Sequence, residues 1–116
     1  MKSIAFTVLY EKLKSREKTQ TYRVLYIPTY EIGEIVKIDF KHEDGRRETL
    51  YQVRISDIYP KQVKDLTLEE TKKDGFDTIN EFQATILKMH HLKSKNRWGF
   101  IIRWEDVLEI TSFLGE

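Results

Sequence analysis

The stretch Lys18-Thr19-Gln20-Thr21-Tyr22-Arg23 places a lysine, a threonine and an arginine at K-x-x-T-x-R spacing. It opens an alternating segment, residues 19–27, and this alternation predicts a β-strand. Because successive side chains of a strand point to opposite faces, Thr21 and Arg23 are expected on one face. An ammonium group, a hydroxyl and a guanidinium so close in sequence can hold a phosphate or a polarised carbonyl group. We therefore predict that the functional site lies at this strand.

Other strands follow this one, and a short helix precedes it. Apolar residues within 7–15 recur near helical spacing, which predicts the helix. Residues 35–40 are predicted to form a second strand. The dipeptide Asp44-Gly45 then favours a hairpin turn into a third strand around residues 51–55.

Two helices are predicted in the second half of the chain. The run Thr67-Leu68-Glu69-Glu70 is a capping box, in which the threonine and the last glutamate satisfy each other's backbone amides. Gly75 is expected to end this first helix. The capping pattern recurs from Thr78, and apolar residues then keep one helical face as far as the His90-His91 pair.

Residues 99–103 and 107–111 are predicted to be closing strands, because the first of them contains a buried-type apolar run. Helices and strands do not alternate, which favours the α+β class over a doubly wound sheet. The expected architecture is a small mixed β-barrel of about five or six strands with two or three short helices. At a length of 116 residues, the chain is expected to form a single domain covering residues 1–116.

The composition, with 40% hydrophobic and 34% charged residues, predicts a folded and soluble chain. No apolar run approaches the roughly 20 residues that a membrane span needs, and the first residues lack the long apolar region of a signal peptide. A cytoplasmic protein without a membrane partner is therefore expected. The absence of cysteine excludes disulfides, thiolate zinc sites and a cysteine nucleophile.

The histidines do not suggest a metal site. His90 and His91 are adjacent, and neighbouring side chains of a helix diverge by about 100°. Only His42 remains as a third histidine. We therefore expect neither a metal ion nor another cofactor.

The net charge of +1 conceals an uneven distribution of charged residues. No acidic residue occurs from Gln83 to Trp104, residues 12–23 form a second basic stretch, and residues 65–81 are rich in acidic residues. This pattern is compatible with polyanion binding on one face, and solvated surface charge is the alternative. Within the acid-free stretch, Trp98 follows Arg97 and can either stack on a base or belong to the core.

The spacing of several motifs resembles that of the ASCH domain, a family named for homology to the activating signal cointegrator. After the K-x-x-T-x-R run come Tyr30-x-x-Gly33-Glu34 before a strand, Leu66-Thr67, and Asp74-Gly75-Phe76 before a helix. The resemblance covers nearly the whole chain and implies a PUA-like fold, a β-barrel with helices packed around a cleft. Two positions depart from the family pattern, because Arg16 replaces its leading glycine and Asp74 replaces its glutamate.

The resemblance implies recognition of RNA or of a modified nucleoside or nucleotide in a cleft. Our leading hypothesis is therefore a binding module with a positively charged cleft, whose oligomeric state the sequence leaves open. The residues that we expect to contact nucleic acid are Arg16, Lys18, Thr21, Arg23, Arg97 and Trp98.

The resemblance also implies enzymatic alternatives. Some bacterial members of the family are amidohydrolases that remove the acyl group of N4-acetylcytidine, and others have been linked to RNA cleavage. The amidohydrolase pattern implies Thr21 as nucleophile, Lys18 as base and Asp74 as orienting carboxylate. A lysine can act as a base only if its pKa falls, which burial favours and a close carboxylate opposes. A protein-interaction domain with a degenerate pocket is a further alternative.

Each candidate residue also has a purely structural interpretation. Lys18 can be solvated at a turn, and Thr21 can simply favour a strand. Arg23 can contact a phosphate, or it can pair with Asp74 or Glu70 across the cleft. Asp74 can do no more than end a helix.

Overall fold

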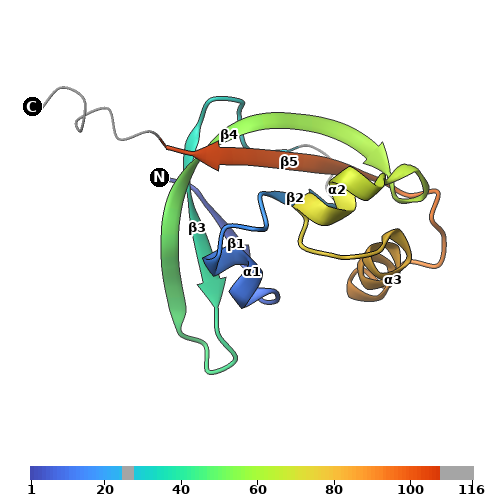
Figure 1. Ribbon diagram of the computed structural model, residues 1–116, viewed down its shortest axis with the longest axis horizontal. Coiled ribbons are helices and arrows are strands. Elements are labelled where there is room, and N and C mark those ends of the chain that lie inside the picture. The colour runs from blue at the N-terminus through green and yellow to red at the C-terminus, as the bar shows by residue number, and fades with distance from the viewer. Residues whose placement is uncertain (25–27, 108–116) are drawn as a thin grey trace, which may run out of the picture.

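The computed structural model describes residues 1–24 and 28–107. In these residues, five strands form one sheet in the order β1-β3-β4-β5-β2. The sheet curls into a half-barrel, with β4 arching over the helices that lie beneath it (Figure 1). The strands are β1 (Ser3–Phe6), β2 (Gln20–Arg23), β3 (Ile35–Lys41), β4 (Arg47–Gln62) and β5 (Trp98–Asp106). The α-helices of the described residues are α1 (Tyr10–Lys14), α2 (Leu68–Lys73) and α3 (Ile79–Met89), and a short 3-10 turn covers Val63–Asp65.

This arrangement confirms the predicted α+β class and the predicted mixed sheet. Strand β1 runs parallel to β3, whereas the other three strand pairs are antiparallel. The long strand β4 makes the curl possible, because its first half pairs with β3 and its second half pairs with β5. The register shifts between Ile55 and Asp57 on β4, and such bulges bend a strand and increase its twist.

The predicted turns and helix caps are confirmed. Gly45 has a φ of 87° in the hairpin between β3 and β4. At α2, Thr67 accepts from the Glu70 amide, and the Glu70 side chain accepts from the Thr67 amide. Thr78 accepts from the Glu81 amide at the start of α3. These local signals suffice because each cap involves residues only a few positions apart.

Several elements differ from the predictions, among them β4, which runs from Arg47 to Gln62 and so extends well beyond the strand predicted around residues 51–55. Strand β1 was not predicted, because four residues that pair with a strand distant in sequence leave little local pattern. The single strand β5 ends at Asp106, so Val107 lies outside it, and the rest of the predicted strand at 107–111 lies outside the described residues. Strand β2 ends at Arg23, and residues 25–27 of the predicted strand also lie outside the described residues.

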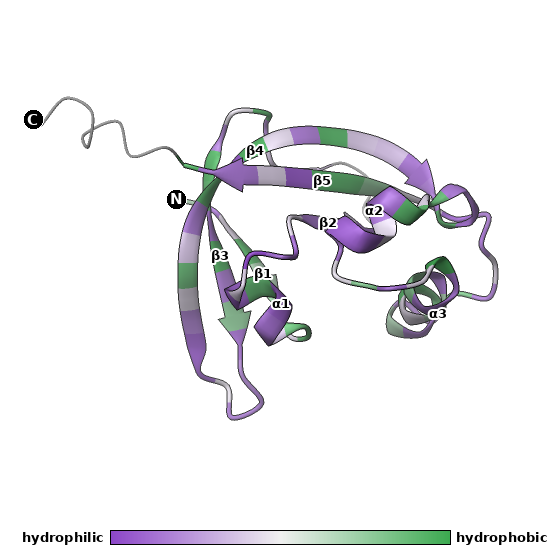
Figure 2. Cartoon of the chain, in the orientation of Figure 1, coloured by the Kyte–Doolittle hydropathy of each residue, from purple (hydrophilic) through white to green (hydrophobic). Residues whose placement is uncertain are grey.

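Two apolar clusters form the core, one on each side of β5. Ile102 belongs to the cluster that includes Leu13 of α1 and the apolar residues of β1, β3 and β4. Its neighbour Ile101 belongs to the cluster that includes Phe82 and Ile86 of α3. The apolar central part of β5 is visible in Figure 2. No helix among the described residues is both long enough and apolar enough to cross a membrane.

Candidate functional site

A cavity of about 270 Å³ lies where β2, the end of α2, α3 and the segment after β1 meet. Its polar floor consists of Lys18, Thr21 and Asp74, which are 3%, 4% and 4% exposed. Exposed residues surround its mouth, among them Val8 and Met89. The structure therefore brings together the lysine, the threonine and the acid that the sequence placed far apart. The other lining residues are Ala5, Phe6, Thr7, Leu9, Tyr22, Arg23, Phe76, Phe82, Thr85, Ile86 and His90.

Lys18 and Asp74 form a buried ion pair on this floor. The Lys18 ammonium contacts the Asp74 carboxylate directly and also donates to the Asp74 backbone oxygen at 2.8 Å. Asp74 is the C-cap residue of α2, so it both ends the helix and contributes to the cavity. Gly75 follows with a φ of 96°, and a Cβ there would lie 3.3 Å from the Leu9 Cδ1. Gly75 thus lets the end of α2 approach the cavity closely.

Gln20 holds the Asp74 carboxylate from the other side. The Gln20 Nε2 donates to the Asp74 Oδ2 at 3.0 Å and to the Glu70 backbone oxygen at 2.9 Å. The Gln20 Oε1 in turn accepts from the Arg103 Nε at 3.2 Å. Every polar atom of this fully buried amide has a partner, so the Asp74 carboxylate is fixed in orientation. The sequence did not predict that Gln20 belongs to the site. The only sequence signal for this role was the position of a glutamine between Lys18 and Tyr22 in the alternating segment.

Burial lowers the pKa of Lys18 below its ordinary value, and the contacting Asp74 carboxylate offsets only part of this effect. The neighbouring Arg23 guanidinium lowers the pKa further. The sequence left two opposing influences on this lysine undecided, and desolvation is the larger one. Lys18 is therefore closer to proton release than a solvated lysine.

Thr21 and Arg23 form a second polar pair facing the same cavity. The Arg23 Nε donates to the Thr21 Oγ1 at 3.0 Å, and the Arg23 Nη2 donates to the Ala5 backbone oxygen at 3.0 Å. Ion pairs among the described residues do not include Arg23, so the suggested bridge to Asp74 or Glu70 is wrong. The Asp74 carboxylate forms its ion pair with Lys18 instead.

The two polar pairs are not joined to each other. Hydrogen bonds within the described residues include none between the Lys18 Nζ and the Thr21 Oγ1. Both cations instead lie over the Phe6 ring, with the Lys18 Nζ and the Arg23 Cζ at 5.3 and 5.1 Å from its centroid. The hydroxyl proton of Thr21 thus remains available to a base or to a bound molecule.

The cavity also combines aromatic walls with a titratable residue at its mouth. The rings of Phe76 and Phe82 stack with centroids 4.9 Å apart. Burial lowers the pKa of His90, and the nearby Arg23 and His91 charges act in the same direction. The His90 ring is therefore neutral near pH 7 and offers one donor and one acceptor. Potential metal ligands do not gather in groups of three or more in the part of the chain that the structure describes.

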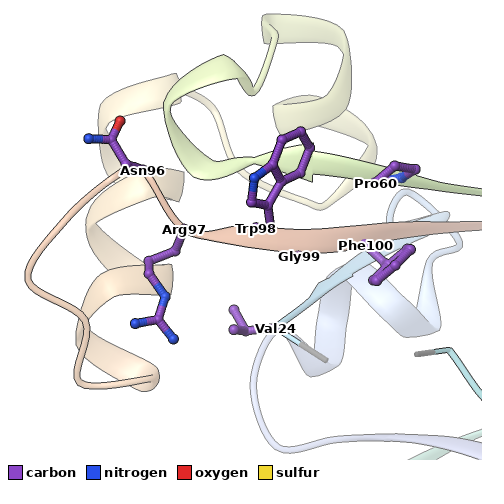
Figure 3. Close-up of a pocket in the computed structure, with 7 residues that line it drawn as sticks. All are labelled: Val24, Pro60, Asn96, Arg97, Trp98, Gly99 and Phe100. Atoms are coloured by element: carbon purple, nitrogen blue, oxygen red, sulfur yellow. The ribbon is translucent and has the colours of Figure 1, made fainter. Parts of the chain in front are cut away.

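Arg97 and Trp98 lie in a separate, open groove of about 540 Å³ (Figure 3). Trp98 is 61% exposed, so of its two interpretations the one as a core residue is wrong. The groove and the cavity are neighbours at the end of β2. Arg23, the last residue of β2, lines the cavity, and the next residue, Val24, lines the groove.

Arg16 lies elsewhere, in a third and smaller hollow beside Tyr51 and Asp106. Its guanidinium contacts the Asp106 carboxylate and lies 4.1 Å from the Tyr51 ring centroid. Arg16 has a φ of 66°, a conformation that favours glycine. Glycine, which the ASCH pattern has at this position, would adopt this backbone conformation without steric cost.

Comparisons with known proteins bear on the fold. The features to compare are the five-stranded sheet in the order β1-β3-β4-β5-β2 and the cavity beside it, which residues of β2 and α3 help to line. No protein-family model matches the sequence. No curated protein matches it.

Two solved structures share the fold. The crystal structure of protein EF3133 from Enterococcus faecalis V583, described as a DUF984 protein, has a TM-score of 0.67 at 14% identity, covering 92% of this chain and 81% of that one. An ASCH domain from Lactobacillus crispatus JV V101 has a TM-score of 0.60 at 9% identity, covering 87% of this chain and 77% of that one. The fold is therefore that of an ASCH domain, as its sequence motifs predicted.

Proposed function

We propose that the cavity binds one nucleotide or nucleoside of RNA, with Lys18, Thr21 and Arg23 as its polar contacts. The observation that carries this proposal is that all three side chains line one cavity whose remaining walls are largely apolar. A volume of about 270 Å³ is slightly below the range of about 300–1,000 Å³ for small-molecule sites, which limits the occupant to one small group such as a single base with its sugar.

The chemistry of the lining suits a planar group that carries hydrogen-bond acceptors. Aromatic side chains such as Phe76 and Phe82 are the groups on which unstacked bases pack in RNA-binding proteins. The polar lining offers N–H and O–H donors from Lys18, Thr21 and Arg23 to carbonyl or phosphate oxygens. The residues that line the cavity include two cations, Lys18 and Arg23, and one carboxylate, Asp74, and this excess of positive charge favours an anionic ligand.

Nucleotide binding at different salt concentrations tests this proposal. Calorimetric titration with nucleoside monophosphates should give an affinity that decreases as salt concentration rises, because a phosphate contact releases counterions. Arg23→Gln should weaken binding and reduce the salt dependence. Arg46→Gln is the matched control, because Arg46 is exposed in the distant β3–β4 hairpin. Binding that is insensitive to Arg23→Gln would argue against the proposal.

A second candidate function is amide hydrolysis on an acylated nucleoside such as N4-acetylcytidine. The observation that favours it is the buried Lys18, which has a lowered pKa and faces the same cavity as Thr21. In this reaction the Thr21 Oγ attacks the acyl carbon, while Lys18 takes the hydroxyl proton and passes it to the leaving amine. The C–N bond then breaks, and water hydrolyses the acyl ester on Thr21 to a carboxylic acid.

Release of cytidine from N4-acetylcytidine tests this second candidate. Thr21→Val keeps the shape of the side chain and removes the nucleophile, so it should abolish turnover. Thr49→Val is a control for the loss of a hydroxyl on a strand outside the cavity. No turnover by the wild-type protein, or equal turnover by Thr21→Val, removes the candidate.

A further inference from the structure

We propose that the groove beside Trp98 is a second subsite, which holds the nucleotide adjacent to the one bound in the cavity. The ligand is then single-stranded RNA rather than a free nucleoside. This inference rests on the proposed function of the cavity and adds to it the class of ligand.

The groove presents an exposed apolar platform. Figure 3 shows the Trp98 ring standing beside Pro60, with Phe100 two residues further along β5. Exposed large apolar side chains among the described residues number six, and three of them surround the cavity mouth or the groove: Val8, Met89 and Trp98. Exposed apolar side chains beside two neighbouring hollows are a feature of binding surfaces. Exposed aromatic rings are the groups on which single-stranded nucleic acids stack their bases.

The groove is held in place by backbone contacts on both sides. The segment before β5 is fixed to the 3-10 turn that follows β4, because the Val63 amide donates to the Arg97 backbone oxygen at 3.0 Å and the Lys64 amide to that of Lys95 at 2.9 Å. At Gly99, a Cβ would lie 2.6 Å from the Tyr22 Oη and 2.8 Å from the Arg23 backbone oxygen. The floor therefore packs tightly on β2, and a ligand finds the platform already formed.

Residues of two paired strands line the two hollows, with β2 at the cavity and β5 at the groove. Arg23 lines the cavity, and its register partner Phe100 lines the groove. Adjacent strands of a sheet lie about 4.7–4.9 Å apart, so the strand residues that line the two hollows are direct neighbours. Such neighbouring hollows suit two consecutive nucleotides joined by a phosphodiester.

Arg97 is placed for that phosphodiester. In Figure 3 its guanidinium extends to the Val24 side of the strand, whereas the Trp98 ring extends to the other side. Ion pairs of the described residues do not include Arg97, and no acidic residue occurs from Gln83 to Trp104. Trp98 thus stacks the second base, and Arg97 contacts the phosphate that leads to the cavity.

A length series tests the inference separately from the proposed function. Affinities are measured by calorimetry for the ribonucleoside monophosphates and for matching homo-oligoribonucleotides of two and six residues. The oligonucleotides should bind more tightly than the mononucleotides. Trp98→Ala should weaken oligonucleotide binding by about tenfold, because base–aromatic stacking contributes on that order per base, and should leave mononucleotide binding unchanged. Leu68→Ala, which removes another exposed apolar side chain, is the control.

The possible results distinguish the two claims. Mononucleotide binding that depends on Arg23, without any gain for oligonucleotides, would overturn the second subsite and leave the proposed cavity function standing. A Trp98→Ala variant that binds oligonucleotides as the wild type does would also overturn it. The absence of binding by both mononucleotides and oligonucleotides would overturn both claims.

Discussion

Lys18 and Asp74, which are 56 positions apart in the chain, form an ion pair that is almost completely removed from solvent. Charges buried to this degree lose their hydration, and only close contact with a partner compensates for the loss. Lys18 precedes β2 and Asp74 ends α2, so the pair also connects the sheet to the helical side of the cavity.

Removing one member of the pair should destabilise the fold strongly. Lys18→Met leaves the Asp74 carboxylate buried without its cation, and such a loss costs about 3–5 kcal/mol. Adding Asp74→Asn should recover much of this loss, because the uncompensated charge is then removed while Gln20 keeps a hydrogen-bond acceptor. Urea denaturation of the single and double variants measures the free energies. A double variant whose loss equals the sum of the two single losses would contradict this account of the pair.

The pKa of Lys18 should fall further when Asp74 is neutral. Burial lowers this pKa and the carboxylate raises it, so Asp74→Asn removes the raising influence. The Cε resonance of labelled lysine, followed by NMR against pH, reports the titration. In both proteins the unfolded chain binds the Lys18 proton more tightly than the folded one does. Stability should therefore increase with pH from the lowered pKa up to the ordinary lysine value. An unchanged or higher pKa in Asp74→Asn would be inconsistent with the geometry.

Gln20 should matter for stability in spite of being an uncharged residue. Gln20→Met deprives the Asp74 Oδ2 and the Glu70 backbone oxygen of a donor, and it deprives Arg103 of an acceptor. Leaving such buried groups without partners costs about 1–3 kcal/mol. Gln52→Met, at an exposed position of β4, should change stability little. Equal effects of the two substitutions in thermal or urea unfolding would show that Gln20 does not hold Asp74.

Arg16 offers a test of backbone strain. Both Arg16→Gly and Arg16→Ala lose the contacts with Asp106 and Tyr51. The difference between their free energies of unfolding therefore reports the effect of a Cβ at the positive φ of 66°. The glycine variant should be the more stable of the two by about 1 kcal/mol, because a Cβ is unfavourable in that conformation. A more stable alanine variant would mean that residue 16 does not adopt this backbone conformation in solution.

Much of the fold follows from local sequence patterns. Alternation predicted the strand around Thr21, the Asp44-Gly45 turn predicted the strand around Val53, and two threonine caps predicted α2 and α3. Each of these signals involves residues close together in the chain. Strand β1 was missed because its partner β3 is distant in sequence and its four residues carry too short a pattern. The prediction of two closing strands at 99–103 and 107–111 also differs from the structure, in which the single strand β5 runs from Trp98 to Asp106.

The site was predictable in its residues but not in its contacts. The K-x-x-T-x-R run and the Asp74-Gly75-Phe76 step indicated three floor residues, which the structure brings into one cavity. Their pairing depends on side-chain directions at the end of α2, which no local pattern encodes. For this reason the expected partner of Asp74 included Arg23, whereas Lys18 and Gln20 contact it. Arg97 and Trp98 were grouped with the cavity, although they line a groove of their own.

The central claim, that the cavity binds a nucleotide, is tested most directly by mapping amide chemical shifts during titration with a nucleoside monophosphate. The account predicts that the largest changes occur at Thr21, Arg23 and residues 74–76, with little change in the β3–β4 hairpin. The same changes should be smaller in Arg23→Gln at equal nucleotide concentration. Saturable binding whose shifts centre elsewhere, or no shifts at millimolar nucleotide, would contradict the claim.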